Sequence, residues 1–162
     1  MKQKVLIILI ILWMGTIFYL SSENSDKSSK TSGNIIEVIA NGILKNNKYT
    51  EKEYDGLIEK AQFIIRKTAH FTIYLIGGIL FCLLYKSYGV GIRKVIIYSL
   101  VSCIFYAITD EIHQSFVPGR GPHITDVIID SSGATCGVLV TIIILNTLKR
   151  LRNKKRKIKN KK

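Results

Sequence analysis

Acidic residues, cysteines and catalytic signatures are scarce in this chain. It has eleven Asp and Glu residues against twenty-four Lys and Arg residues, which gives a net charge of +13. Its three cysteines are odd in number and lie at no metal-ligand spacing, so the sequence favours neither a disulfide framework nor a zinc site. HExxH, CxxC and phosphatase signatures are also absent from the sequence. Motifs alone therefore indicate no particular catalytic chemistry.

Hydrophobic and basic residues are segregated along the chain. Hydrophobic residues make up 48% of the sequence, which is unusual for a soluble domain of such high charge. The apolar residues gather in four runs, at about 5–20, 68–85, 92–109 and 127–148. Each run is about as long as a helix must be to cross roughly 30 Å of hydrocarbon. The sequence therefore predicts an all-α membrane protein with four transmembrane helices in one domain, residues 1–148.

The first run has features of both a signal peptide and a membrane anchor. Lys2 and Lys4 precede it, as basic residues do in either case. However, Tyr19 and Leu20 place bulky side chains where a signal peptidase requires small ones. We expect an uncleaved anchor.

The distribution of Lys and Arg predicts the orientation of the chain, because cytoplasmic segments retain positive charge. With the N-terminus inside, the inner segments hold most of the basic residues and none of the eleven acidic residues. Both termini are then cytoplasmic, including a basic tail at residues 149–162. This tail is expected to attract anionic lipids of the inner leaflet. Nucleic acid is not an expected partner, because the tail lacks stacking aromatics and a folded basic surface.

The segment between the first two runs is expected to be partly helical. Helical spacing of apolar residues predicts an amphipathic helix on the outer membrane surface. The residues with this spacing are Ile35, Ile36, Ile39 and Ile43. Thr50 and Glu53 match a capping box, and no helix breaker follows. One long helix from about Glu51 to Tyr85 is therefore predicted.

Polar and ionisable residues gather at the predicted outer ends of the last three runs. Such groups cost at least about 2.5 kcal/mol at the centre of a membrane helix, so they indicate partners or function. Asp110 and Gln114 lie one helical turn apart, as do Asp126 and Asp130. We expect one site at this level. Its predicted binding residues are Lys67, His70, Tyr74, Asp110, Glu111, Gln114, Arg120, Asp126 and Asp130.

Arg120 is a strong candidate for ligand recognition. Prolines and glycines at positions 118, 119, 121 and 122 stiffen the turn around it. A guanidinium in such a turn, beside Asp110 and Glu111, suits an anionic headgroup or a polar glycan. The structural alternative is that Arg120 and Lys67 pair with carboxylates and hold the helix ends together.

Several other residues near these ends have simpler interpretations. His113 and His123 are interpreted as hydrated loop residues, because nothing in the sequence fixes their direction. The cysteines all lie within predicted spans, where packing is the expected role. Gly133 and Gly137 form a GxxxG pattern that would let another helix approach closely.

Four stretches in a fixed order carry a family resemblance. They are Trp13 with the following IFYLSS, RKTAHFTIY at 66–74, DEIHQSFVPGR at 110–120, and DVIIDSSGATCG at 126–137. Together they resemble the VanZ-like family of bacterial integral membrane proteins. The resemblance implies a multi-pass protein of the bacterial cell membrane. It also implies a possible role in lowering susceptibility to the glycopeptide antibiotic teicoplanin.

The resemblance assigns family-like positions and one departure. The matching positions are Lys67, His70, Tyr74, Asp110, Glu111, Gln114, Arg120, Asp126, Gly133 and Gly137. Asp130 stands where such proteins usually carry Asn, and the extra acid changes the charge balance of the predicted site.

Three functional hypotheses follow. The first is a non-catalytic envelope protein that binds membrane lipid, a lipid-linked envelope precursor or a glycopeptide through its outer site. The second is a membrane-embedded hydrolase or transferase acting on an envelope lipid, with or without a metal ion. Its candidate catalytic residues are His70, Asp110 and Glu111. The third is an ion-coupled transporter, which would require a homodimer. The sequence specifies no cofactor.

Overall fold

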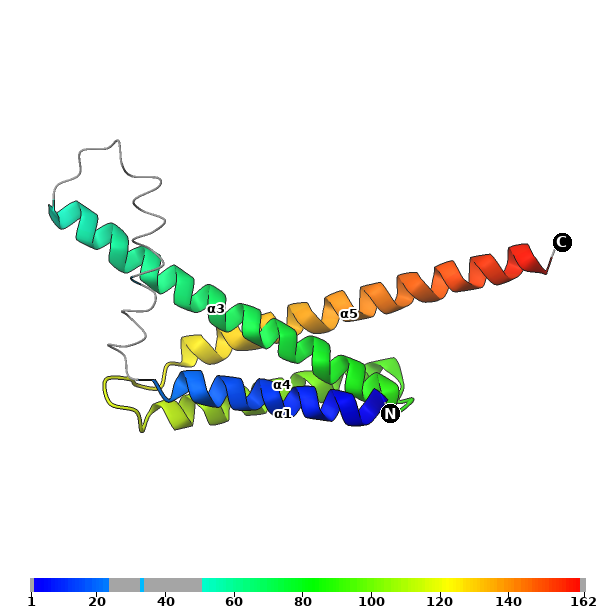
Figure 1. Ribbon diagram of the computed structural model, residues 1–162, viewed down its shortest axis with the longest axis horizontal. Coiled ribbons are helices and arrows are strands. Elements are labelled where there is room, and N and C mark those ends of the chain that lie inside the picture. The colour runs from blue at the N-terminus through cyan, green and yellow to red at the C-terminus, as the bar shows by residue number, and fades with distance from the viewer. Residues whose placement is uncertain (1, 24–32, 34–50, 161–162) are drawn as a thin grey trace.

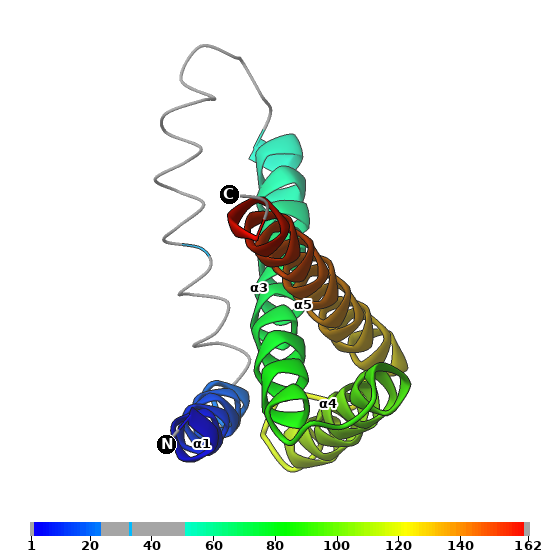
Figure 2. The same ribbon diagram turned by 90° about the vertical axis from the view of Figure 1, so that its right-hand side faces the viewer.

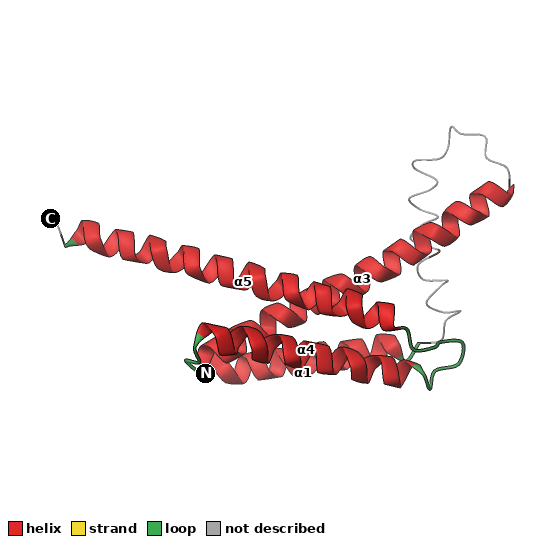
Figure 3. Cartoon of the chain, turned by 180° about the vertical axis from the view of Figure 1, so that it is seen from behind, coloured by secondary structure: helices red, strands yellow, loops and turns green. Residues whose placement is uncertain are grey.

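The computed structural model describes residues 2–23, 33 and 51–160, and over these residues it is helical with no strand (Figures 1 and 3). Its long helices are α1 (Lys2–Ser21), α3 (Glu51–Ser87), α4 (Ile92–Gln114) and α5 (Ile124–Lys159). The predicted surface helix at Ile35–Ile43 and the predicted capping box at Thr50 and Glu53 lie outside the residues or side chains described.

All four helices are long and apolar enough to cross a membrane. The shortest, α1, has 20 residues, which at about 1.5 Å per residue spans about 30 Å. The prediction of an all-α protein with four spans is confirmed. The long helix predicted from about Glu51 to Tyr85 is also found, as α3.

Two helices continue beyond the apolar runs that predicted them. Helix α4 extends through the polar residues at its end to Gln114, and α5 continues through the basic segment to Lys159. Lys and Arg are good helix formers, so the loss of apolar character does not end the helix. Figure 1 shows α5 extending well beyond the other helices at its C-terminal end, and in Figure 2 this end of α5 points toward the viewer.

Helix α3 packs most extensively against α5, and glycine allows this contact. A Cβ atom on Gly133 would overlap the carbonyl oxygen of Phe71, and one on Gly137 would overlap that of Leu75. On the opposite helix, a Cβ atom on Gly78 would overlap the carbonyl of Ala134. The close helix approach predicted from the GxxxG pattern is therefore present.

Trp13 attaches α1 to the rest of the bundle. Its ring packs edge-on against Tyr74, with 5.6 Å between centroids, and its Nε1 donates a hydrogen bond of 2.8 Å to the carbonyl of Ile73. Gly77 leaves room for this ring, because a Cβ atom there would overlap it. Tyr106 of α4 adds a 2.6 Å hydrogen bond from its hydroxyl to the carbonyl of Met14. One aromatic cluster thus connects α1, α3 and α4.

The two described connections between helices are short. Gly89, with φ of +74°, provides the left-handed turn between α3 and α4. Gly119, with φ of +77°, does the same in the loop between α4 and α5, residues 115–123. As a result, the end of α4 and the start of α5 lie at the same end of the bundle, beside the end of α1 (Figure 1). We call this end the polar end.

Candidate functional site

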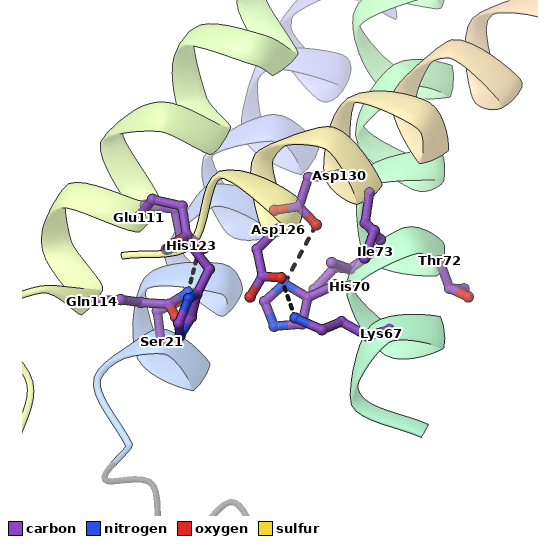
Figure 4. Close-up of polar contacts among 12 residues, drawn as sticks. Ser21, Lys67, His70, Thr72, Ile73, Glu111, Gln114, His123, Asp126 and Asp130 are labelled. Carbon is purple, nitrogen blue, oxygen red and sulfur yellow. Dashed lines mark hydrogen bonds and ion pairs between the residues drawn. The ribbon is translucent and has the colours of Figure 1, made fainter. Parts of the chain in front are cut away.

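The polar end brings together side chains that the sequence predicted as a site, and Figure 4 shows Lys67, His70, Glu111, Gln114, Asp126 and Asp130 among them. Helix α3 contributes Lys67 and His70, and α5 contributes Asp126 and Asp130. The spacings of three and four residues place each pair on one face of its helix. Two polar contacts between α3 and α5 result.

The first contact is an ion pair and hydrogen bond between the Lys67 ammonium and the Asp126 carboxylate. Asp126 is buried, so the lysine neutralises a carboxylate that would otherwise be costly. This part of the structural alternative is found: Lys67 holds α3 and α5 together at the polar end.

The second contact joins His70 to Asp130. The imidazole Nδ1 lies 3.4 Å from Asp130 Oδ1. Asp130 is fully buried at 0% exposure, whereas the His70 side chain is 27% exposed. Within the described part of the chain, neither oxygen of Asp130 accepts a hydrogen bond. His70 thus lies beside a buried carboxylate, and its own side chain remains partly accessible.

The carboxylates of α4 make internal contacts. Asp110 Oδ2 accepts a hydrogen bond of 3.0 Å from Gln114 Nε2, which also approaches Ser21 Oγ of α1 at 3.4 Å. Glu111 Oε2 accepts one of 2.8 Å from the backbone N–H of His123, the residue that precedes α5. Both carboxylates therefore position helix ends, and Glu111 fixes the start of α5.

A cavity of about 560 Å³ opens at the polar end. Its polar lining includes Lys67, His70, Tyr74, Gln114, Arg120 and Asp126 from the predicted site. The predicted residues Asp110, Glu111 and Asp130 are buried but do not line it. The structure therefore divides the predicted set into residues that face the cavity and carboxylates behind them.

The cavity also has residues that the predicted binding set omitted. They include the polar residues Ser21, Glu23, Arg66 and His123 and the apolar residues Ile17, Leu20, Phe63, Ile65 and Ile73. Arg66 lies four residues before His70, a spacing that already placed both on one face of the helix. The apolar lining had no such signal, because those side chains resemble any others in a membrane helix.

Arg120 lines the cavity without an ionic partner. Among the described residues, its side chain forms no hydrogen bond or ion pair, and it is half-buried. The expected pairing with Asp110, Glu111 or Asp126 is not found. The reason is that Gln114, His123 and Lys67 already contact those carboxylates.

His113 and His123, which were interpreted from the sequence as hydrated loop residues, both make more specific contributions to the structure. His113 stacks on Phe18, with 4.3 Å between ring centroids, and its Nε2 lies 3.1 Å from Ser22 Oγ. The expectation that nothing fixes His113 is therefore wrong, since α1 holds it. His123 is exposed as expected, but it also lines the cavity.

The three cysteines and the His, Asp and Glu side chains were considered in the sequence as packing residues or metal ligands. Cys82 and Cys103 are buried and Cys136 is half-buried, all three as free thiols within helices. Across the described ranges, no group of three or more His, Cys, Asp or Glu side chains is arranged to hold a metal ion.

The fold and the site define a class of protein: a four-helix membrane protein with a cavity, partly polar and partly apolar, at one end of its bundle. The model of the VanZ/LLP1 family matches residues 6–145, and the chain belongs to that family. This match confirms the resemblance noted in the sequence. Comparisons with curated proteins and with solved structures gave no match.

Proposed function

We propose that the cavity at the polar end binds the anionic headgroup of an envelope lipid. The observation that carries this proposal is Arg120, a half-buried cation that lines the cavity without a partner among the described residues. A guanidinium offers several donors in a fixed plane, which matches phosphate and carboxylate oxygens. The cavity thus has a cation available for a ligand.

The rest of the cavity wall supports an amphiphilic ligand. Arg66 and Lys67 add positive charge to its lining, and Ile17, Leu20 and Phe63 add apolar surface. A lipid likewise combines a polar headgroup with hydrocarbon. An end of a bundle of membrane-spanning helices lies near headgroup level, where such a ligand is available.

We further propose that this end faces the outside of the bacterial cell membrane, with both termini in the cytoplasm. The basic residues beyond Lys149 support this orientation, because positive charge is retained inside. A lipid-linked envelope precursor is then among the accessible ligands. Binding such a precursor would alter the access of a teicoplanin-type glycopeptide and so lower susceptibility to it.

A susceptibility assay tests this consequence. A susceptible host expresses the wild type, Arg120→Ala or Arg152→Ala at matched membrane levels, with teicoplanin beside vancomycin. Arg152→Ala removes the same charge from the exposed part of α5. We expect protection against teicoplanin from the wild type and from Arg152→Ala, and none from Arg120→Ala. If the wild type gives no protection, the proposed role in glycopeptide resistance is wrong.

A further inference from the structure

His70 and Asp130 form a pair in which a buried carboxylate lies beside one ring nitrogen of a histidine that lines the cavity. Ligand binding alone does not require this arrangement. Asp130 is fully buried, and among the described residues the one basic side chain paired with it is His70, through Nδ1. A buried carboxylate is costly unless its charge is used or compensated. Figure 4 shows the imidazole facing Asp130 through one ring nitrogen. Nε2 lies on the other edge of the ring, and the His70 side chain lines the cavity.

We propose that His70 is a nucleophile that removes the phosphoryl group of a lipid phosphate bound in this cavity, and that Asp130 positions and activates it. This inference rests on the proposed function, because the same cavity must first bind an anionic lipid. It adds a substrate class, a phosphate ester at the end of an apolar chain, and a reaction.

Asp130 suits the positioning role. A carboxylate beside Nδ1 favours the neutral tautomer with its proton on Nδ1, which leaves the lone pair on Nε2. The same carboxylate stabilises the positive ring that forms when Nε2 makes a bond. Asp130 itself does not line the cavity. It therefore acts through His70.

The cations of the cavity suit the phosphoryl group. Arg66, Lys67 and Arg120 line the same cavity as His70, so their positive charge lies near a phosphoryl group bound there. Phosphoryl transfer depends mainly on positioning and on stabilising these charged oxygens. The apolar wall accommodates the chain of the lipid. The proposed nucleophile and the cations that would stabilise the phosphate charge thus line one cavity.

The reaction has two steps. In the first, the Nε2 lone pair of His70 forms a bond to phosphorus, and the bond from phosphorus to the lipid oxygen breaks. That oxygen keeps the electron pair and takes a proton from water, which releases the lipid alcohol and leaves hydroxide. In the second, hydroxide bonds to phosphorus, and the P–N electron pair returns to Nε2. The products are lipid alcohol and inorganic phosphate, and His70 is regenerated.

The test uses the purified full-length protein in detergent micelles with a short-chain phosphatidic acid as the probe. Released phosphate is measured for the wild type, His70→Asn, Asp130→Asn and His113→Asn. His113 is the matched control, because it lies at the polar end but does not line the cavity. We expect His70→Asn to lose phosphate release. Asp130→Asn should lower it by about a hundredfold or more, as loss of the orienting carboxylate does in other His–Asp pairs.

Three further readouts separate this inference from the proposed function. Binding of a fluorescent phosphatidic acid should change less than about threefold in both variants, because Arg120 remains; this is a shift of under 1 kcal/mol. An acid-labile phosphoryl label from radiolabelled substrate should be trapped on the wild type and not on His70→Asn. Lipid-free nitrophenyl phosphate should be a poor substrate, since it lacks the apolar chain.

The outcomes are distinct. Binding by the wild type without phosphate release would overturn the catalytic inference and leave the proposed function intact. Absence of binding by the wild type would overturn both. Phosphate release that persists in His70→Asn, or that requires His70 but gives no trapped label, would overturn its assignment as the nucleophile. Equal turnover of nitrophenyl phosphate would overturn the assignment of a lipid substrate.

Discussion

At the scale of single residues, side-chain pairs between α3 and α5 hold these two helices together at the polar end. Lys67 and Asp126 form an ion pair whose side chains are only 21% and 11% exposed. Partial burial limits screening by solvent, so this pair is expected to stabilise more than an exposed one. His70 and Asp130 are one turn further along, and their geometry depends on the same helix register.

Replacing Lys67 with Met removes the charge and leaves Asp126 buried without its partner. We expect the free energy of unfolding to fall by about 1–3 kcal/mol, the range for a buried polar group that loses its hydrogen bond. Thermal unfolding in detergent measures the change. The double variant with Asp126→Asn should recover part of the loss, as a double-mutant cycle detects. Additive losses would show that the two residues are not coupled.

At the scale of the elements, the contact between α3 and α5 sets the site. Gly133 allows the α5 backbone to approach Phe71 of α3 closely. Because His70 precedes Phe71 and Asp130 lies three residues before Gly133, this contact brings the two ionisable side chains together. The site therefore depends on a residue with no side chain.

Gly133→Ala is expected to separate the two helices, because its Cβ atom would overlap a backbone carbonyl that cannot rotate away. We expect a loss of stability of about 1–3 kcal/mol, typical of overpacking. Thermal unfolding in detergent, with lipid binding as a second readout, measures it. The matched control is Gly15→Ala in α1, where a Cβ atom meets nothing within 4 Å. Equal stability of the two variants would contradict the role given to Gly133.

The elements were largely predictable from the sequence, and the site only in part. Apolar runs predict spans because the length of each run must match the hydrocarbon thickness. The rotation of each helix is harder to predict: α1 carries no charge from Val5 to Leu20, so no polar face distinguishes its buried side. For this reason the role of Ile17 in the cavity wall had no signal. Asp130 could be placed at the site, but its complete burial required the structure.

At the scale of the whole molecule, the distribution of charge determines the expected orientation. The exposed C-terminal part of α5 is rich in Lys and Arg, and it lies beyond the end of the bundle opposite the polar end (Figure 1). Positive segments remain in the cytoplasm. The cavity should therefore open outside the cell.

Cysteine labelling tests this orientation. Ser115→Cys reports on the polar end and Asn153→Cys on the basic part of α5, and both positions are exposed. In intact cells, a membrane-impermeant maleimide should label position 115 and should reach position 153 only after permeabilisation. The parent chain is the control, because its three thiols lie within helices. Labelling of position 153 in intact cells would show that the basic part of α5 lies outside, which contradicts the proposed orientation.

The binding of an anionic lipid by the cavity is the central claim, and direct binding by the purified full-length protein tests it. The affinity for a fluorescent short-chain phosphatidic acid is compared among the wild type, Arg120→Ala and Arg152→Ala. A charged hydrogen bond contributes about 1.5–3 kcal/mol, so Arg120→Ala should weaken binding by about 10–100-fold. Arg152→Ala should bind like the wild type. Equal affinity of all three proteins, or no binding by any of them, would contradict the account.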